Sequence, residues 1–513
     1  MKTKLLAVSV LSLSLIFIVQ SFAKNIDNTE FEKWKKKHNK EVTNFVEKYD
    51  KDFASFLKTR WVETDVIAGE QRDNQPKPQQ TPEKQPEPVV DETPVEIVLP
   101  DIELPEIKPE QDIPEVPDVS LPKDKVPDTK VKPPFYYVAD DTDSSGKSIV
   151  GKSIEVSLLG QTLIMPKVTL PTLTIKKLSS GVIAELWLAM ASSDYKPAIA
   201  AIEQASHDLK LDDWGNALLT HKFLISQTGL TQNERQLLTW FYLVKQGFDA
   251  RVAFDKNEIY LLLNTAQTLF AQKFFTFDEQ KYYFVDFAKT RPINIGSVYT
   301  YEQQYSSAKK AVKIDMRVAP LQGESDKTRV LKTKIGKQSV SVTAPYNSNY
   351  IDFLNFYPQV SMQYYFQAEL PEQTKISLLS QLKQDIAGLS ELEAANFLLH
   401  FVQTSLQYQT DQQQFNYENY LFAGETLHYP YADCEDRSVF FAYLVTHLMG
   451  NKVVGLQYDG HVATAVALKS KTSGSSFLIN NVRYTIADPT FINANVGEVM
   501  TGFEGVEPEL VIY

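Results

Sequence analysis

The chain has 513 residues, of which 43% are hydrophobic and 12% aromatic, and it carries a formal net charge of −12. This length exceeds what one hydrophobic core supports, so we expect two or three folded units with connecting segments. The acidic balance argues against nucleic-acid binding, because neutralising phosphates requires a basic face.

The first 23 residues have the pattern of a secretory signal peptide. An apolar stretch from Leu5 to Val19 follows two lysines, and Ser21 and Ala23 are small residues at the positions that a signal peptidase reads. We predict cleavage after Ala23 and export, with the periplasm as the expected location. A retained anchor is the alternative, although the apolar run is shorter than the ~20 residues that span a bilayer.

Residues 24–70 are predicted to form an amphipathic helical segment. Between residues 30 and 61, apolar side chains recur at spacings of three, four and eight among many lysines and glutamates. These are Phe31, Trp34, Val42, Phe45, Tyr49, Phe53 and Phe56. Such a helix must bury its apolar stripe, so we expect a partner helix, a second copy, the membrane surface or the main body to cover residues 30–61.

Residues 71–134 are predicted to be a proline-rich, disordered linker. Fifteen of the 26 prolines lie between Gln75 and Pro134, among charged residues and valines and without aromatics. At ~3.1 Å per residue such a segment, if fully extended, could hold a catalytic head well over ~100 Å from an anchored helix. A passive linker would do the same mechanical job.

The remainder contains four pairs of similar blocks in the same order, which predicts an internal duplication. The pairs are GKSIEVS from Gly151 with GKQSVSV from Gly336, WGNALLTHKFLI from Trp214 with AANFLLHFVQTS from Ala394, TWFYLVKQGFDARVAF from Thr239 with FFAYLVTHLMGNKVVGL from Phe440, and YYFVDF ending at Phe287 with YTIADPTF. We therefore predict an α+β fold with one unit at 135–295, a β-rich connecting region at 296–374 and a second unit at 375–513. Ser390 and Glu393 predict a capping box at the start of one helix of the second unit.

Three residues of the second unit predict nucleophilic catalysis. Cys434 is the single cysteine, so it has no partner for an internal disulfide, and it falls in the first turn of a predicted helix where the dipole lowers a thiol pKa. His461 opens a predicted strand, and Asp488 ends another. This order places thiol, imidazole and carboxylate at three element ends. A buried, inert thiol is the alternative interpretation.

The motifs DCEDRSVFFAYLV, GHVATAVAL and YTIADPTF resemble the transglutaminase-like superfamily, and the resemblance covers Lys375 to Phe491. It implies a papain-like fold with Cys434 as nucleophile, His461 as general base and acid, and Asp488 as the orienting residue. The chain departs from the family pattern at Ala432 and Ala463, where a glycine and an aromatic residue often stand.

The first unit is predicted to be a degenerate copy without catalytic residues. Alignment through Tyr242, Leu243 and Val244 places Asn233 at the cysteine position, Tyr260 at the histidine position and Asp286 within one residue of the aspartate. The nucleophile and the base are then missing, so this unit would serve as a scaffold or a substrate-binding wall.

Asp433, Glu435 and Asp436 surround the cysteine with carboxylates, which would raise the thiol pKa. Either these side chains point away from the thiol, two of them complementing the helix N-terminus, or they hold a hard cation such as calcium. The tetrapeptide DCED also resembles that of bacterial periplasmic transglutaminase-like proteinases that use calcium. No spacing of cysteine and histidine predicts zinc, no glycine-rich loop predicts a nucleotide, and we expect no other required cofactor.

The sequence thus predicts an exported cysteine-dependent amide hydrolase or acyl transferase that acts on a protein or peptide of the cell envelope. Hydrolysis is favoured over transfer to an amine, because water is abundant unless the site excludes it. The alternative is a binding or scaffold protein of the envelope that keeps the fold without catalysis.

Overall fold

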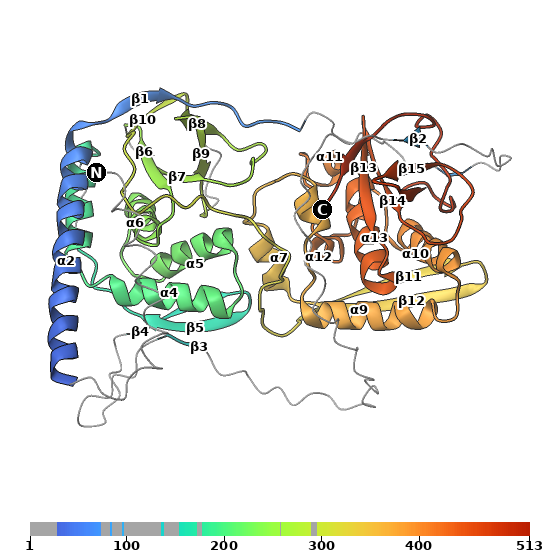
Figure 1. Ribbon diagram of the computed structural model, residues 1–513, viewed down its shortest axis with the longest axis horizontal. Helices are drawn as coiled ribbons and strands as arrows, with labels where there is room; N and C mark the ends of the chain where they lie inside the picture. The colour runs from blue at the N-terminus through green and yellow to red at the C-terminus, as the bar shows by residue number, and fades with distance from the viewer. Residues whose placement is uncertain are drawn as a thin grey trace. The chain divides into compact units, whose positions relative to one another are not determined.

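The computed structural model describes residues 28–72, 83–84, 95–96, 135–137, 153–171, 177–256, 258–288 and 295–513. These residues form a mixed α+β protein with several separate sheets (Figure 1). The chain divides into a unit made of residues 1–61 and 170–193 and a larger unit made of residues 62–169 and 194–513. The predicted signal peptide lies outside the described residues.

The smaller unit is built from two helices that pack together, α2 (Asn28–Thr59) and α3 (Ser180–Ala191). Phe53 and Leu57 of α2 are buried, and the Phe53 ring meets Trp187 of α3 edge to face at 4.8 Å between centroids. The helix is shorter than the predicted segment 24–70, because it ends at Thr59 and a strand begins at Val62.

The first half of the larger unit contains an antiparallel six-stranded sheet with the order β1-β10-β6-β7-β9-β8. Its strands are β1 (Val62–Asp65), β6 (Ala250–Phe254), β7 (Ile259–Asn264), β8 (Phe274–Phe277), β9 (Gln280–Val285) and β10 (Ser297–Thr300). One face carries the buried cluster of Ala253, Leu262, Phe275, Tyr282, Phe284 and Val298.

A small sheet and three helices complete this first half. The small sheet has the order β3-β5-β4, from β3 (Phe135–Tyr136), β4 (Ser153–Leu158) and β5 (Gln161–Pro166). The helices are α4 (Lys196–Asp208), α5 (Asp213–Ile225) and α6 (Gln232–Lys245). Helix α4 packs against β5, α5 against β4, and α6 against β6 and β7. A capping box between Thr231 and Glu234 starts α6.

The second half contains a six-stranded sheet with the order β17-β13-β14-β16-β15-β2, antiparallel except for the pair β15–β2. Its strands are β2 (Val95–Glu96), β13 (Val453–Tyr458), β14 (His461–Val466), β15 (Ser476–Ile479), β16 (Val482–Ala487) and β17 (Glu509–Val511). One face carries the buried cluster of Val454, Leu456, Tyr458, Ala463, Ala465, Phe477, Ile479, Tyr484 and Ile486.

A long hairpin and seven helices accompany this second sheet. The hairpin is β11 (Lys327–Ile335) with β12 (Gln338–Tyr346), and the helices are α7 (Ser348–Leu354), α8 (Gln363–Phe366), α9 (Glu372–Asp385), α10 (Glu391–Ser405), α11 (Asp411–Gln414), α12 (Ala423–Thr426) and α13 (Cys434–Met449). Helix α9 packs against β12, α10 against β11, and α13 against β13 and β14. The predicted capping box of Ser390 and Glu393 starts α10 and is confirmed.

The predicted connecting region 296–374 is divided between the two halves. Strand β10 joins the first sheet, whereas the β11–β12 hairpin packs with α9 and α10 of the second half. The packing also corrects one predicted match, because residues 153–157 of GKSIEVS lie in the first strand of their hairpin, whereas residues 338–342 of GKQSVSV lie in the second strand of the other. Short strands in hairpins share the same alternating pattern, so sequence alone did not distinguish them.

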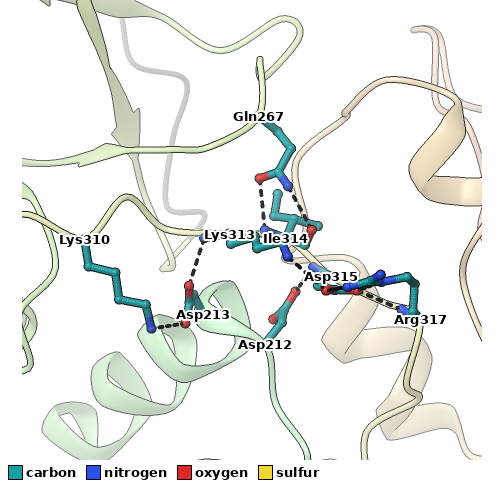
Figure 2. A network of polar contacts seen from close by, with 8 residues as sticks. All are labelled: Asp212, Asp213, Gln267, Lys310, Lys313, Ile314, Asp315 and Arg317. Carbon is teal, nitrogen blue, oxygen red and sulfur yellow. Dashed lines mark hydrogen bonds and ion pairs between the residues drawn. The ribbon is translucent and has the colours of Figure 1, made fainter. Parts of the chain in front are cut away.

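A polar network fixes the segment that follows β10 (Figure 2). Asp212, the N-cap of α5, accepts hydrogen bonds from the backbone N–H of Asp315 at 2.8 Å and from the Tyr357 hydroxyl at 2.6 Å. The Gln267 amide exchanges two 3.0 Å hydrogen bonds with the backbone of Ile314. Burial raises the pKa of Asp212 to about 6, because the charged carboxylate is removed from water.

The proline-rich region contacts the second half at residues 83–84 and 95–96. The Lys84 backbone N–H donates to the Ile492 carbonyl at 3.0 Å, and the Lys84 ammonium pairs with Glu498. Strand β2 extends the sheet beside β15. Because β1 precedes this region, the prediction of a spacer between α2 and the folded body is wrong: only Arg60 and Trp61 separate α2 from the first sheet. Within the described ranges no helix is long and apolar enough to cross a membrane.

Candidate active site

The three predicted residues lie at element ends in the second half. Helix α13 begins at Cys434, strand β14 begins at His461, and Asp488 directly follows β16. Strands β14 and β16 pair antiparallel, with Thr464 opposite Ala487. The N-terminal end of β14 and the C-terminal end of β16 therefore lie at the same end of the two paired strands.

His461 and Asp488 form a buried hydrogen-bonded pair. The distance from His461 Nε2 to Asp488 Oδ2 is 2.8 Å. The other carboxylate oxygen accepts hydrogen bonds from the backbone N–H groups of Thr490 at 2.9 Å and Phe491 at 3.2 Å, which fixes the carboxylate. In the described part of the chain, His461 Nδ1 has no hydrogen-bond partner.

The Cys434 thiol is completely buried, with 0% of the residue exposed. Its sulfur accepts a hydrogen bond from the Val462 backbone N–H, next to His461. The thiol itself donates to Glu435 Oε2 at 3.2 Å, rather than to the imidazole. Burial, followed by the charges of Glu435 and Asp433, raises the pKa of Cys434 well above its usual value, which opposes the lowering that a helix N-terminus gives.

Of the three flanking carboxylates, Glu435 hydrogen-bonds the thiol, whereas Asp433 and Asp436 accept hydrogen bonds from other segments of the chain. Asp433, Glu435 and Asp436 are all buried. Asp433 makes no side-chain hydrogen bond as the N-cap of α13. Asp436 does accept from the Asp433 backbone N–H and so complements the helix start, while its Oδ1 accepts from the Leu421 N–H at 2.9 Å.

Two carboxylates that the sequence analysis missed complete this acidic cluster. Asp411 begins α11 and donates its backbone N–H to Asp433 Oδ2 at 3.1 Å, while its side chain accepts from the Asn419 N–H at 2.6 Å. Carboxylate oxygens of Asp411, Glu418 and Glu435 lie within 4.8 Å of one another, as do those of Asp411, Asp433 and Asp436. We call these five residues the acidic cluster.

The acidic cluster has unsatisfied oxygen atoms and little balancing charge. One oxygen each of Asp433, Glu435, Asp436 and Glu418 is buried without a hydrogen-bond partner among the described residues. The neighbouring Arg437 is buried too, but its guanidinium donates to the carbonyls of Ala432, Gln403 and Leu406. Burial, together with mutual repulsion, raises the pKa of Glu435 and Asp436 well above usual values. Oxygen-only donors of this kind fit a hard cation.

The first half has different side chains at the corresponding positions. Val453–Val466 and Ala250–Leu263 are equivalent end pairs of their hairpins, which makes Glu258, not Tyr260, the counterpart of His461. The strand pairs that follow make Asp286 the counterpart of Asp488. Asn233 Oδ1 accepts from the Ile259 N–H at 2.9 Å, the counterpart of the Val462 N–H that hydrogen-bonds Cys434.

Asp286 has a histidine neighbour, but one from a different element. The Asp286 charge acts on His221 of α5, although burial dominates and lowers the pKa of His221 to about 4. His221 Nδ1 lies 3.3 Å from Thr239 Oγ1. The first half therefore lacks both a thiol and a strand histidine at this site.

Comparison of the chain with protein-family models, curated proteins and solved structures gives no match.

Proposed function

We propose that this chain is an exported, cysteine-dependent amide hydrolase of the transglutaminase-like type. Cys434 is the nucleophile, His461 the general base and acid, and Asp488 the group that orients the imidazole. The observation that carries this proposal is the 2.8 Å bond between His461 Nε2 and Asp488, since it leaves Nδ1 as the ring atom available for the thiol proton.

The proposed reaction transfers one proton in each direction. His461 Nδ1 takes the thiol proton, and the Cys434 sulfur attacks the amide carbonyl carbon to give a tetrahedral oxyanion near the N-terminus of α13. The backbone N–H of Cys434 is one candidate donor to that oxyanion. Collapse breaks the C–N bond, and His461 returns the proton to the leaving amine. Water, activated by the same imidazole, then hydrolyses the thioester; an amine in place of water would give transamidation.

We propose that the chain contains two tandem transglutaminase-like units, of which the first is degenerate. Five consecutive strands have corresponding orders in the two sheets, β10-β6-β7-β9-β8 and β17-β13-β14-β16-β15. The helices before them pack on their hairpins in the same way, α4 and α5 in the first half and α9 and α10 in the second. These correspondences support a duplication in which only the second copy retains thiol and imidazole.

Calcium is the cation that we propose for the acidic cluster. Calcium takes roughly six to eight oxygen ligands, which carboxylates supply. Asp433, Glu435 and Asp436 would hold it, in line with the second of the two interpretations drawn from the sequence, joined by Asp411 and Glu418. The unpartnered buried oxygens of the cluster fit such an ion. A bound cation would offset the negative charge that opposes formation of the thiolate.

Glu435 connects the acidic cluster with the thiol. Its Oε2 accepts the thiol hydrogen bond at 3.2 Å, and its Oε1 is one of the buried oxygens without a described partner. When the Glu435 carboxylate binds calcium in the acidic cluster, it no longer accepts the hydrogen bond from the thiol. We propose that His461 Nδ1, which has no hydrogen-bond partner among the described residues, then accepts the thiol proton.

A non-catalytic envelope binding or scaffold protein is the second candidate function. The observation that favours it is the state of Cys434 itself, which is fully buried and hydrogen-bonded to Glu435 instead of His461. In that case the second half would keep its residues for stability, as the first half does. The targets would again be protein or peptide components of the envelope.

Labelling of the thiol separates the two candidates. Cys434 is the single cysteine, so a thiol-reactive probe at neutral pH reports on one site without further engineering. If Cys434 is the nucleophile, its labelling in the presence of calcium should be at least ~10-fold slower in His461→Ala than in the wild type, because the base is lost. Glu258→Ala in the first half, at the position that corresponds to His461, is the matched control and should leave the rate unchanged. Equal rates in wild type and His461→Ala would contradict the proposal.

Comparison of envelope proteomes then tests the reaction. Cells that carry the native protein should show peptide termini that cells with Cys434→Ala lack. New crosslinks instead of new termini would indicate transamidation. Identical peptide termini and crosslinks in the two kinds of cell would contradict the enzymatic proposal and favour the scaffold function.

A further inference from the structure

Helix α2 presents one apolar stripe, but only its C-terminal part is covered. Phe53 and Leu57 are buried in the contact with α3. Trp34, Val42 and Phe45 lie earlier in the same helix and are 53%, 48% and 56% exposed. Single exposed apolar residues are ordinary, whereas a continuous exposed row of large side chains indicates a surface that binds something.

We define the open stripe as Phe31, Trp34, Val42, Phe45 and Tyr49. Spacings of three, four and eight residues place these side chains on one face of α2. Their rings contact one another, with 6.0 Å between the centroids of Phe31 and Trp34 and 4.5 Å between those of Phe45 and Tyr49. Trp34 and Tyr49 each combine an apolar ring with a polar group, and such side chains are enriched where membranes meet water.

The charge around the open stripe is opposite to that of the chain. Residues 31–49 contain six lysines and three glutamates, a net charge of +3, while the whole chain carries −12. All six lysines are exposed. One weak pair, Lys37 with Glu41 at 4.0 Å, joins two exposed side chains of this segment and neutralises little. A second copy would bring like charges together, whereas an anionic surface would complement them.

We propose that the open stripe binds the surface of an anionic lipid bilayer. The aromatic side chains would enter the boundary between headgroups and acyl chains, and the lysines would remain at the headgroup phosphates. The helix would lie parallel to the surface, since no described helix is apolar enough to cross it. This inference is independent of the proposed enzymatic function, because it uses no residue of the candidate active site.

Vesicle flotation of the chain from Lys24 onward tests the proposal. The probe is a pair of vesicle preparations, one of phosphatidylcholine alone and one with roughly one part phosphatidylglycerol to three parts phosphatidylcholine. We expect binding to the anionic vesicles that weakens as salt is added. The double variant Trp34→Ser/Phe45→Ser should bind at least ~10-fold less tightly, because it removes two aromatic anchors.

The matched control is Val330→Ser/Ile376→Ser, which replaces two apolar residues of similar exposure in the larger unit and should bind like wild type. Replacing Lys33, Lys36, Lys37 and Lys40 by Gln should reduce binding and its salt dependence. Helix content measured by circular dichroism checks that the variants fold. Failure of wild type to bind anionic vesicles overturns the proposal, as does equal binding by the Trp34→Ser/Phe45→Ser variant. A lipid-independent dimer that this variant abolishes would assign the stripe to a second copy.

Discussion

The two halves of the larger unit make the same hydrogen bond with different side chains. Asn233 in the first half and Cys434 in the second each accept from the equivalent backbone N–H at the start of a strand. Asp286 and Asp488 likewise each accept from the N–H two residues later, at 2.9 Å in both cases. Both halves therefore place a hydrogen-bond acceptor at each of the two positions, and in the first half that acceptor is not a thiol.

The acidic cluster separates the halves more sharply. Helix α6 has one carboxylate in its first turn, Glu234, and that side chain is half-buried and forms a capping box with Thr231. Helix α13 buries Asp433 at its N-cap and Glu435 and Asp436 in its first turn. Because burying unpaired carboxylates is costly, their presence in one half only indicates a role that folding does not explain.

Exchanging the residues at the thiol position should have the largest effect. Cys434→Asn installs the side chain of the first half, keeps an acceptor for the Val462 N–H and should lower activity at least ~10⁴-fold, as measured by peptide termini released in envelope fractions. Adding Asn233→Cys to this variant should not restore activity, because Glu258 stands where the base is needed. Recovered activity would show that the two halves are interchangeable.

Replacing the two equivalent aspartates should give the second largest difference in activity between the halves. Asp488→Asn keeps the shape of the side chain but loses the charge that orients and stabilises His461, so we expect activity to fall ~10²–10⁴-fold. Asp286→Asn, at the equivalent position, should change activity by less than about twofold. Alkylation rates of Cys434 in the two variants provide a second measurement. Similar losses in both would mean that the aspartate is structural.

The buried histidine of the first half should make the stability of the protein depend on pH in acid. Burial lowers the pKa of His221 from 6.5 to about 4, so the unfolded state binds more protons between these values and stability is lost as pH falls through this window. The full loss is roughly 3 kcal/mol. His221→Phe should remove this part of the pH dependence in urea titrations at pH 7 and pH 4. His207→Phe, at an exposed site on α4, is the control and should behave like wild type.

Calcium should distinguish the halves by protection from hydrogen exchange. Calcium at ~100 times its dissociation constant stabilises a folded site by ~2.7 kcal/mol. We expect slower exchange in 411–437 and no change in 212–240, where no comparable cluster is described. Glu435→Gln should weaken calcium binding in calorimetry, with Glu234→Gln as the matched control. Equal protection of both halves would argue against the acidic cluster as the site.

The sequence predicted the positions of Cys434, His461 and Asp488 at element ends because local signals define those ends. Apolar periodicity and an acidic residue mark the start of α13, and β-branched runs bounded by polar turns mark β14 and β16. The α+β class followed from the same patterns. These features depend on neighbours in the sequence, which one chain displays directly.

Features that depend on loops were missed. Asp411 and Glu418 reach the acidic cluster through segments without a regular pattern. Tyr260 was assigned to the histidine position because the alignment followed helical residues, yet eight residues lead from Tyr242 to the start of β6 and ten from Tyr443 to the start of β13. Strand β1 is four residues long, and its partner β10 lies more than 200 residues away, so nothing local predicts it.

The attachment of the proline-rich region on both sides has a consequence for limited proteolysis. On its N-terminal side, Arg72 donates to the Val360 carbonyl at 2.7 Å and its guanidinium lies 3.5 Å from the centre of the Tyr420 ring. On the other side, Lys84 is bound to Ile492 and Glu498. A cut between Arg72 and Glu83 would therefore give a nicked protein whose two fragments copurify and separate only on denaturation. Helix α2 would be retained through β1, which β10 holds within the sheet.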